Sequence, residues 1–260
     1  MTDIGIFSFG GGVQSTAALV LAARREIDIK QFVFANTGDD SESAATLSFI
    51  ERIAKPYAKA HGLSLETVAK KQTLYENLVG ANRTIAIPVY LRTQNDEAAP
   101  GNRKCTSDWK IKPIASFLRK LGAKPKQPGV VAIGISTDEC HRAKDSQIAS
   151  QTHSFPLLDL GISRLECGNI IREAGLEVPP KSACWFCPYK KLKEWRRMAA
   201  EEPELFERAA KLEAKLEAKR GDMGKDSIFL TRTLKPLSEA VLPSEQLSLF
   251  DDDCTGYCWT

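Results

Sequence analysis

Three consecutive glycines stand near the start of the chain in Phe7-Ser8-Phe9-Gly10-Gly11-Gly12-Val13-Gln14-Ser15-Thr16. An apolar run over residues 4–9 precedes them and an apolar helical pattern over residues 17–23 follows, which predicts a strand, a glycine turn and a helix start. Adjacent glycines let the backbone turn tightly and bring bare N–H groups against an anion. Ser15 and Thr16 add hydroxyl donors at the positive end of the helix dipole. The segment therefore predicts a phosphate-binding turn, with a plain turn capped by Ser15 as the structural alternative.

Apolar runs and helical patterns alternate along most of the chain. Further strands are predicted at residues 32–35, 64–68 and 130–135. Helices are predicted at residues 15–25, 43–60, 73–82 and 163–174, whereas residues 83–104 are irregular. Strands that are apolar on both faces and alternate with helices are typical of a parallel sheet covered on both sides. We therefore expect an α/β fold with a doubly wound, mostly parallel sheet.

A second region begins near residue 181. It contains Cys184-Trp185-Phe186-Cys187-Pro188 and a highly charged helical pattern over residues 190–220. We expect an α/β domain over residues 1–180 and a helical, cysteine-containing extension over residues 181–260 packed on it. Trp195 stands among lysines and arginines in this extension, as in a helix that faces RNA or DNA; a solvated helix packed on the core is the alternative.

The composition narrows the classes of function. The chain has 260 residues and a net charge of +3, which is too slight to indicate a polyanionic partner. Neither an N-terminal signal pattern nor an apolar run of about 18 residues is present, so we expect a cytoplasmic protein without a membrane partner. Seven cysteines in such a protein favour metal or redox chemistry over a disulfide scaffold.

Polar turns follow two other predicted strands. Asn36-Thr37-Gly38-Asp39-Asp40 comes after the second strand, and residues 136–142 come after the fourth. Ligands of open α/β sheets lie beyond the carboxyl ends of the strands, so we expect both turns near the glycine loop. An ordinary turn is the alternative for the first of them. In the second, Arg142 or Lys144 is expected to contact the bound ligand.

The Cys184-x-x-Cys187 turn points two thiolates at one centre, and such turns are the unit of both zinc and iron–sulfur sites. Proline directly after Cys187 favours the iron–sulfur interpretation. A pair of unligated thiols and a redox dithiol are the alternatives.

The glycine loop resembles the PP-loop, Ser-Gly-Gly-x-Asp-Ser, of the adenine nucleotide alpha hydrolase superfamily. Gly11, Gly12 and Ser15 agree with that motif, while Gly10 stands in place of its serine and Gln14 in place of its aspartate. The second departure removes a carboxylate that could help to hold Mg²⁺.

Later segments resemble the PAPS/APS (phosphoadenylyl/adenylyl sulfate) reductase branch of this superfamily, and the resemblance covers roughly residues 4–190. Asn36-Thr37-Gly38 is similar to its Asp-Thr-Gly turn. The segment Arg103-Lys104-Cys105-Thr106-Ser107-Asp108-Trp109-Lys110-Ile111-Lys112-Pro113-Ile114 is similar to Cys-Cys-x-x-Arg-Lys-Val-x-Pro-Leu, with Thr106 in place of the second cysteine. Gly134 fits a Gly-x-Arg segment of the same family.

The resemblance implies that residues 1–180 bind ATP or an adenylyl sulfate nucleotide, with Mg²⁺ as a further ion. The residues that it places at the nucleotide are Ser8, Gly10, Gly11, Gly12, Gln14, Ser15, Thr16, Asn36, Thr37, Gly38 and Gly134.

The resemblance also implies a 4Fe–4S cluster, with zinc as the alternative metal. The implied ligands are Cys105, Cys184, Cys187 and Cys258. A ligand of the family is lost at Thr106, so the tail cysteines, Cys254 or Cys258, or else Cys167 would complete a four-cysteine site. Otherwise three ligands would leave one iron open, which is typical of a catalytic metal site.

The leading hypothesis is a PP-loop ATP pyrophosphatase that thiolates a nucleic acid or a small molecule with sulfide from the cluster. Its candidate catalytic residues are Cys258, Cys254, Lys110 and Arg142. One alternative is an APS/PAPS reductase, in which a tail thiolate attacks the sulfur of the nucleotide. Another is a non-catalytic nucleotide-binding protein with a structural zinc site. Besides the nucleotide, the expected partners are a sulfur donor or acceptor, a sulfur-delivery or reductant protein, and a nucleic acid.

Overall fold

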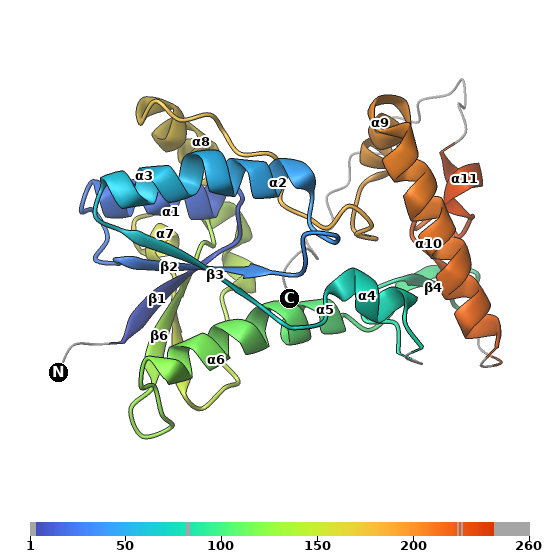
Figure 1. Ribbon diagram of the computed structural model, residues 1–260, viewed down its shortest axis with the longest axis horizontal. Helices are drawn as coiled ribbons and strands as arrows, with labels where there is room; N and C mark the ends of the chain where they lie inside the picture. The colour runs from blue at the N-terminus through green and yellow to red at the C-terminus, as the bar shows by residue number, and fades with distance from the viewer. Residues whose placement is uncertain (1–3, 82–83, 223, 225, 242–260) are drawn as a thin grey trace. The chain divides into compact units, whose positions relative to one another are not determined.

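The computed structural model describes residues 4–81, 84–222, 224 and 226–241 (Figure 1). The chain divides into two compact units. The first comprises residues 1–71 and 107–183, and the second comprises residues 72–106 and 184–260. The second unit therefore takes in a segment, residues 72–106, that precedes the C-terminal extension in the sequence.

The first unit is built on a five-stranded sheet in the order β3-β2-β1-β6-β7, and every neighbouring pair is parallel. Its strands are β1 (Gly5–Phe9), β2 (Gln31–Asn36), β3 (Ser64–Ala69), β6 (Gly129–Ile133) and β7 (Gln151–Ser154). The sequence predicts all of them except β7. This strand reads Gln-Thr-His-Ser and lies at the edge of the sheet, so it carries no apolar run that would mark it.

Helices and short helical turns connect these strands, and two more helices follow the last of them. They are α1 (Val13–Ala23), α2 (Ala44–Phe49), η1 (Ile50–Ala54), α3 (Lys55–Ala60), η2 (Ser107–Ile111), α6 (Lys112–Lys120), η3 (Thr137–Arg142), α7 (Pro156–Asp159) and α8 (Arg164–Glu173). The predicted helix over residues 43–60 is present, but its middle is the π-helical turn η1. This turn precedes Pro56, which has no N–H to give to a regular helical bond. The start of α8 follows from a capping box, in which Ser163 and Glu166 bond to each other's backbone N–H.

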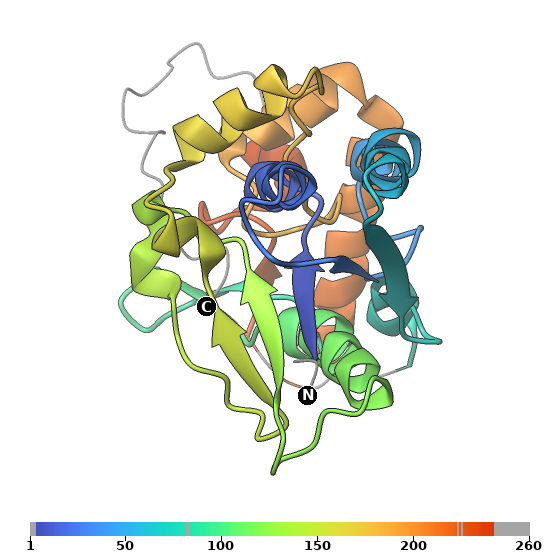
Figure 2. The same cartoon turned by 90° about the vertical axis from the view of Figure 1, so that its left-hand side faces the viewer.

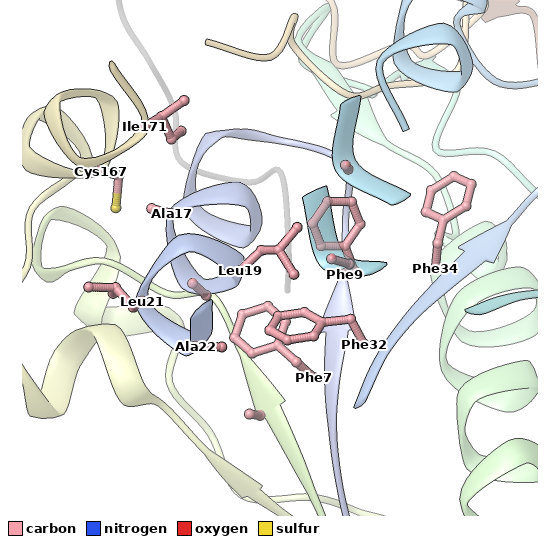
Figure 3. Packing of buried hydrophobic residues seen from close by; sticks show 14 of the residues in the cluster. Phe7, Phe9, Ala17, Leu19, Leu21, Ala22, Phe32, Phe34, Cys167 and Ile171 are labelled. Atoms are coloured by element: carbon pink, nitrogen blue, oxygen red, sulfur yellow. The ribbon is translucent and has the colours of Figure 1, made fainter. Parts of the chain in front are cut away.

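Both faces of the sheet are packed against helices. On one face Phe7, Phe9 and Phe32 lie against α1, and Cys167 and Ile171 of α8 cover α1 from outside (Figure 3). Because successive strand residues point to opposite faces, the neighbours of these phenylalanines contact α6 on the other side. Figure 2 shows α1, in dark blue, nearly end-on at one side of the parallel sheet. The predicted α/β fold with a parallel, helix-covered sheet is confirmed, and it is consistent with a Rossmann-like, HUP-type arrangement.

The second unit contains a three-stranded antiparallel sheet in the order β5-β4-β8. Its strands are β4 (Tyr90–Arg92), β5 (Ala98–Pro100) and β8 (Ile228–Phe229). Its helices are α4 (Leu74–Val79), α5 (Lys104–Thr106), α9 (Leu192–Glu201), α10 (Pro203–Gly221) and α11 (Leu237–Ala240). Residues 83–104 are therefore less irregular than the sequence predicts, since β4 and β5 form a hairpin within them.

A buried carboxylate organises the end of the second unit. Glu213 of α10 accepts hydrogen bonds from the backbone N–H groups of Leu230, at 2.6 Å, and Leu237, at 2.5 Å. Burial raises the pKa of Glu213, and the two N–H donors partly oppose this shift. The side chain thus fixes the path of the chain after β8 to the middle of α10.

None of the helices in the described part of the chain combines the length and the apolar character that crossing a membrane requires.

Candidate functional site

The glycine loop lies at the carboxyl end of β1 and needs glycine at its centre. Gly11 has a φ of 72°, and a Cβ atom there would lie 2.9 Å from Cγ2 of Thr46 and 3.2 Å from Cδ1 of Ile50. A side chain would therefore be strained by the backbone and would collide with its surroundings. The loop is a close-packed turn and not a flexible connection.

The first turn of α1 presents backbone donors without a capping side chain. Its N-cap is Gly12, whose N–H donates to Oγ of Ser15 at 3.1 Å. The next three N–H groups, those of Val13, Gln14 and Ser15, have no carbonyl within the helix to bond to. They stand at the positive end of the helix dipole, where phosphate is favoured. The helix begins two residues earlier than the sequence predicts, because Gly12 takes the extended N-cap conformation.

Gln14 joins this helical turn to two distant segments. Its Nε2 donates to Oε2 of Glu139 at 3.0 Å, and its Oε1 accepts from Nη1 of Arg164 at 2.9 Å. Nη1 of Arg142 pairs with the other oxygen of Glu139 at 2.6 Å. Arg164 and Glu139 thus contact the amide of Gln14 directly, and Arg142 is joined to it through Glu139. The predicted residues Gln14 and Arg142 lie in one polar network of the first unit.

The sequence did not indicate Arg164, which makes two hydrogen bonds in this network, one from its side chain and one from its backbone. Besides its bond to Gln14, its backbone N–H donates to Oδ2 of Asp138 at 2.5 Å. This bond holds the pKa of Asp138 below its usual value. The carboxylate of Asp138 thus caps the first turn of α8. Its negative charge already occupies the positive end of that helix.

The turn after β2 is held by its own side chains. Oδ1 of Asn36 accepts from the N–H of Gly38 at 2.8 Å, and Nδ2 of Asn36 donates to Asp39 at 2.7 Å. Gly38 has a φ of 128°, which a residue with a side chain would rarely adopt. Oγ1 of Thr37 donates to Oε1 of Glu42 at 2.9 Å, and both residues are buried. Asn36, Thr37 and Gly38 therefore shape the turn.

Three buried oxygens near these turns have no hydrogen-bond partner within the described residues. They are Oγ1 of Thr16, Oγ1 of Thr46 and Oε2 of Glu42. A buried polar atom without a partner costs about 1–3 kcal/mol, so such atoms point to a group that completes them. Thr46 contacts the centre of the glycine loop through its methyl group.

Two further residues predicted to bind the nucleotide, Gly134 and Ser8, lie in or directly after strands of the parallel sheet. Gly134 follows β6, and a Cβ atom there would lie 3.3 Å from both Cβ of Gln14 and Cζ of Phe7. Its lack of a side chain lets the end of β6 approach the first turn of α1. Ser8 is a half-buried residue of β1 between Val33 and Ile133 of the neighbouring strands.

Ser182 belongs to the loop although it is far away in the sequence. Its Oγ donates to the carbonyl of Gly10 at 2.6 Å and lies 3.6 Å from the position of a Cβ atom on Gly11. The next carbonyl, that of Ala183, accepts from the N–H of Ser43 at 3.3 Å. No local pattern marks Ser182, because its role follows only from a contact between distant parts of the first unit.

The segment Cys105 to Lys110 spans the boundary of the two units. Lys110 is a half-buried residue of η2 in the first unit, next to the buried Trp109, whose ring lies 4.1 Å from Nζ of Lys70. Cys105 lies in α5 of the second unit. Cys184 and Cys187 belong to the same unit but to a later segment of the chain.

Cys187 lies close to Cys184 in the chain and to a backbone donor and a second thiol. Its N–H donates to the carbonyl of Cys184 at 3.1 Å. Burial raises the pKa of Cys187, the backbone N–H of Tyr189 opposes this, and the nearby Cys105 raises it further. N–H donors to sulfur and neighbouring thiols are the chemistry that an iron–sulfur or zinc site uses.

These thiols do not form a complete metal centre by themselves. Among the described residues, no group of three or more Cys, His, Asp or Glu side chains is placed to hold a metal ion. The predicted residues Cys254 and Cys258 lie outside the described residues. Cys167 is fully buried in the core of the first unit, and burial raises its pKa to about 12, which disfavours the thiolate form that binds a metal.

Trp195 does not face solvent. It is completely buried, and Nζ of Lys190 lies 5.9 Å from the ring centroid. The indole is therefore not exposed to stack on a base of RNA or DNA in this structure.

A scan against models of protein families and a search of curated proteins find no match to this chain.

Proposed function

We propose that the first unit binds the phosphate groups of ATP or of an adenylyl nucleotide at the glycine loop. The observation that carries the proposal is the first turn of α1, whose N-cap residue has no capping side chain and which follows Gly11, where a Cβ atom would lie 2.9 Å from Cγ2 of Thr46. Backbone N–H groups in this position bind phosphate through both hydrogen bonds and the helix dipole. The resemblance to PP-loop proteins leads to the same ligand.

The proposed reaction is the activation of a substrate oxygen by ATP, followed by sulfur transfer. The N–H groups of Val13, Gln14 and Ser15 would hold the β- and γ-phosphates and stabilise the charge that develops on the leaving pyrophosphate. Arg164 and Arg142 lie in the same network as Gln14 and supply positive charge beside these donors. Held in this way, the polyphosphate would present its α-phosphorus to the substrate oxygen.

The cysteines of the second unit are the proposed site of sulfur chemistry. Cys105, Cys184 and Cys187 would hold an iron–sulfur cluster, or zinc in the alternative, and a cluster would supply sulfide when bound. Because the described residues form no complete centre, no step of the reaction is assigned to it.

Calorimetric titration with ATP and with inorganic pyrophosphate tests the proposal directly. We expect saturable binding of one nucleotide per chain, and release of pyrophosphate from ATP and Mg²⁺ once the substrate is added. Absence of any binding would contradict the proposal. Release of sulfite from adenylyl sulfate and a reductant would instead establish the sulfonucleotide reductase.

A further inference from the structure

We propose that Glu42 is a ligand of a divalent cation of the Mg²⁺ type, bound on the β2 side of the glycine loop. The evidence is a buried carboxylate in the connection after β2, so the inference does not depend on the donors of α1. It rests on the proposed function in one respect, because the ion is expected to accompany the polyphosphate. Gln14 stands where the PP-loop motif has an aspartate, and Glu42 supplies a carboxylate from another segment.

Glu42 has a partner for only one of its two carboxylate oxygens. The residue is 2% exposed, and its Oε1 accepts from Oγ1 of the buried Thr37 at 2.9 Å. Its Oε2 is buried without a hydrogen-bond partner among the described residues, which also provide no ion pair for the carboxylate. A buried charge is costly unless it is paired or coordinates a metal. The negative charge of Glu42 therefore calls for a positive partner.

The kind of partner follows from the charge and the burial. A water molecule would bond to Oε2 but would leave the charge uncompensated. An organic cation needs accessible surface, which so deeply buried a side chain does not offer. A single metal ion meets both conditions, and carboxylate oxygen is a preferred ligand of Mg²⁺.

A single carboxylate is sufficient for an ion of this type. Mg²⁺ is usually bound through one or two carboxylates and completes its shell with waters and with phosphate oxygens of the substrate. The described residues contain no group of three or more Cys, His, Asp or Glu side chains that could hold a metal ion, as a zinc centre would need. Glu42 therefore fits Mg²⁺ better than zinc.

The segment that carries Glu42 lies against the glycine loop. The N–H of Glu42 donates to the carbonyl of Gly38, just after β2, at 2.9 Å. Four residues later, Cγ2 of Thr46 lies 2.9 Å from the place of a Cβ atom on Gly11. Oγ1 of Thr46 is a second buried oxygen of this segment without a partner among the described residues. An ion at Glu42 would add positive charge on this side of the loop, where a polyphosphate is expected.

The experiment uses the full chain and Mn²⁺, which takes the oxygen ligands of Mg²⁺ and whose free form is counted by electron paramagnetic resonance. Titration without nucleotide gives the affinity, and Mg²⁺ should displace the bound ion. The variants are Glu42→Gln, which removes the charge at nearly the same size, and Glu42→Asp, which keeps a carboxylate. Glu66→Gln is the control, since Glu66 belongs to β3 of the same unit and its Oε1 already accepts from Gln31 at 3.0 Å.

The wild type should bind one Mn²⁺ per chain. Glu42→Gln should weaken binding by roughly tenfold or more, Glu42→Asp should bind more tightly than Glu42→Gln, and Glu66→Gln should match the wild type. Circular dichroism checks that each variant is folded. Absence of Mn²⁺ binding in the wild type, or wild-type affinity in Glu42→Gln, would overturn the inference.

A second measurement locates the ion without any substitution, and it decides the matter if Glu42→Gln does not fold. Fe²⁺ bound in place of Mg²⁺ forms hydroxyl radicals with hydrogen peroxide and ascorbate, and these radicals cleave the backbone near the ion. Mass spectrometry should find cleavage within residues 37–46, and excess Mg²⁺ should suppress it. Cleavage confined to other parts of the chain would overturn the assignment to Glu42.

Calorimetry with ATP, in EDTA and in Mg²⁺, separates this inference from the proposed function. Binding of ATP by a protein that binds no Mn²⁺ would overturn the inference and leave the proposed function standing. Binding of Mn²⁺ at Glu42 by a protein that binds ATP under neither condition would overturn the proposed function and leave Glu42 as a cation ligand.

Discussion

Gln14 donates from Nε2 to Oε2 of Glu139 at 3.0 Å, although 125 residues separate the two in the sequence. Its other amide atom accepts from Arg164, so one side chain ties α1 to η3 and α8. An amide can do this because it is donor and acceptor at once, which the aspartate of the PP-loop motif is not. Glutamine in place of the motif's aspartate therefore lets residue 14 hold both η3 and α8 to α1 through hydrogen bonds.

The Gln14→Ala variant should lose both bonds and lower the free energy of unfolding by about 1 kcal/mol. Gln31→Ala provides the control, because Gln31 makes a comparable 3.0 Å bond to Glu66 on an exposed surface and should cost less. Urea denaturation of both variants measures the difference. Equal losses in the two variants would show that the network around Gln14 adds nothing to stability.

Gly11→Ala should abolish ATP binding. The new methyl group would meet Thr46 and would force the loop out of shape. Gly175→Ala is a close control: Gly175 has a φ of 73°, almost that of Gly11, but no atom within 4 Å of the added carbon. Both variants should lose stability through the backbone, by roughly 1 kcal/mol, and only the first should lose ATP in calorimetry. Unchanged ATP affinity in Gly11→Ala would remove the loop as the phosphate site.

Glu213 should make stability depend on pH in a definite direction. Burial raises the folded-state pKa above the reference value of 4.5, so the folded chain holds the proton more tightly than the unfolded chain. Its contribution is therefore complete below pH 4.5 and is lost as the pH rises through the raised value. Urea midpoints of the wild type and Glu213→Gln, measured from pH 4 to pH 8, should approach each other as the pH increases.

Glu213→Gln should also be less stable than the wild type at every pH, by about 1–3 kcal/mol. One amide oxygen cannot accept from both Leu230 and Leu237, and the amide nitrogen would face an N–H donor. A pH profile of the wild type parallel to that of the variant would contradict the assignment of the titration to Glu213.

The described cysteines should differ sharply in reactivity. Cys140 is exposed, whereas Cys167 is fully buried with its pKa raised to about 12. Brief treatment of the folded protein with iodoacetamide at neutral pH should label Cys140 and spare Cys167. Peptide mapping by mass spectrometry reads out both sites. Labelling of Cys167 at the rate of Cys140 would mean that the packing between α1 and α8 opens readily.

Metal content should depend on the second unit. Protein purified without oxygen is expected to contain iron and sulfide, and Cys184→Ser should lose them. Cys140→Ser is the control, since it removes an exposed thiol of the first unit and should leave the metal content unchanged. Elemental analysis with a visible spectrum distinguishes iron from zinc. Metal retained in full by Cys184→Ser would exclude Cys184 as a ligand.

Most of the architecture of the first unit can be predicted from the sequence, because its inner strands are apolar on both faces. Phe7, Phe9 and Phe32 lie in such runs and form the core that the pattern predicts. The polar β7 and the two-residue β8 leave no comparable signal, since their pairing partners alone define them.

The candidate site was predictable only where its chemistry is local. The glycine loop and the turn at Asn36 are read from consecutive residues, and both lie at the carboxyl ends of neighbouring strands. The contacts of Ser182 with Gly10 and of Arg164 with Gln14 join residues far apart in the chain. Such contacts depend on the folded topology and have no periodicity that a sequence could display.

The interleaved order of the two units has a consequence for synthesis on the ribosome. β4 pairs with β5 on one edge and with β8 on the other, where Tyr90 lies opposite Phe229. The first unit is complete in the nascent chain at residue 183, long before β8 emerges. The edge of β4 that later pairs with β8 therefore stays unpaired at a stage when the first unit can already fold. Other extended chains could pair with this edge. The second unit is the last part of the protein to mature and the first in which a stalled or truncated chain would aggregate.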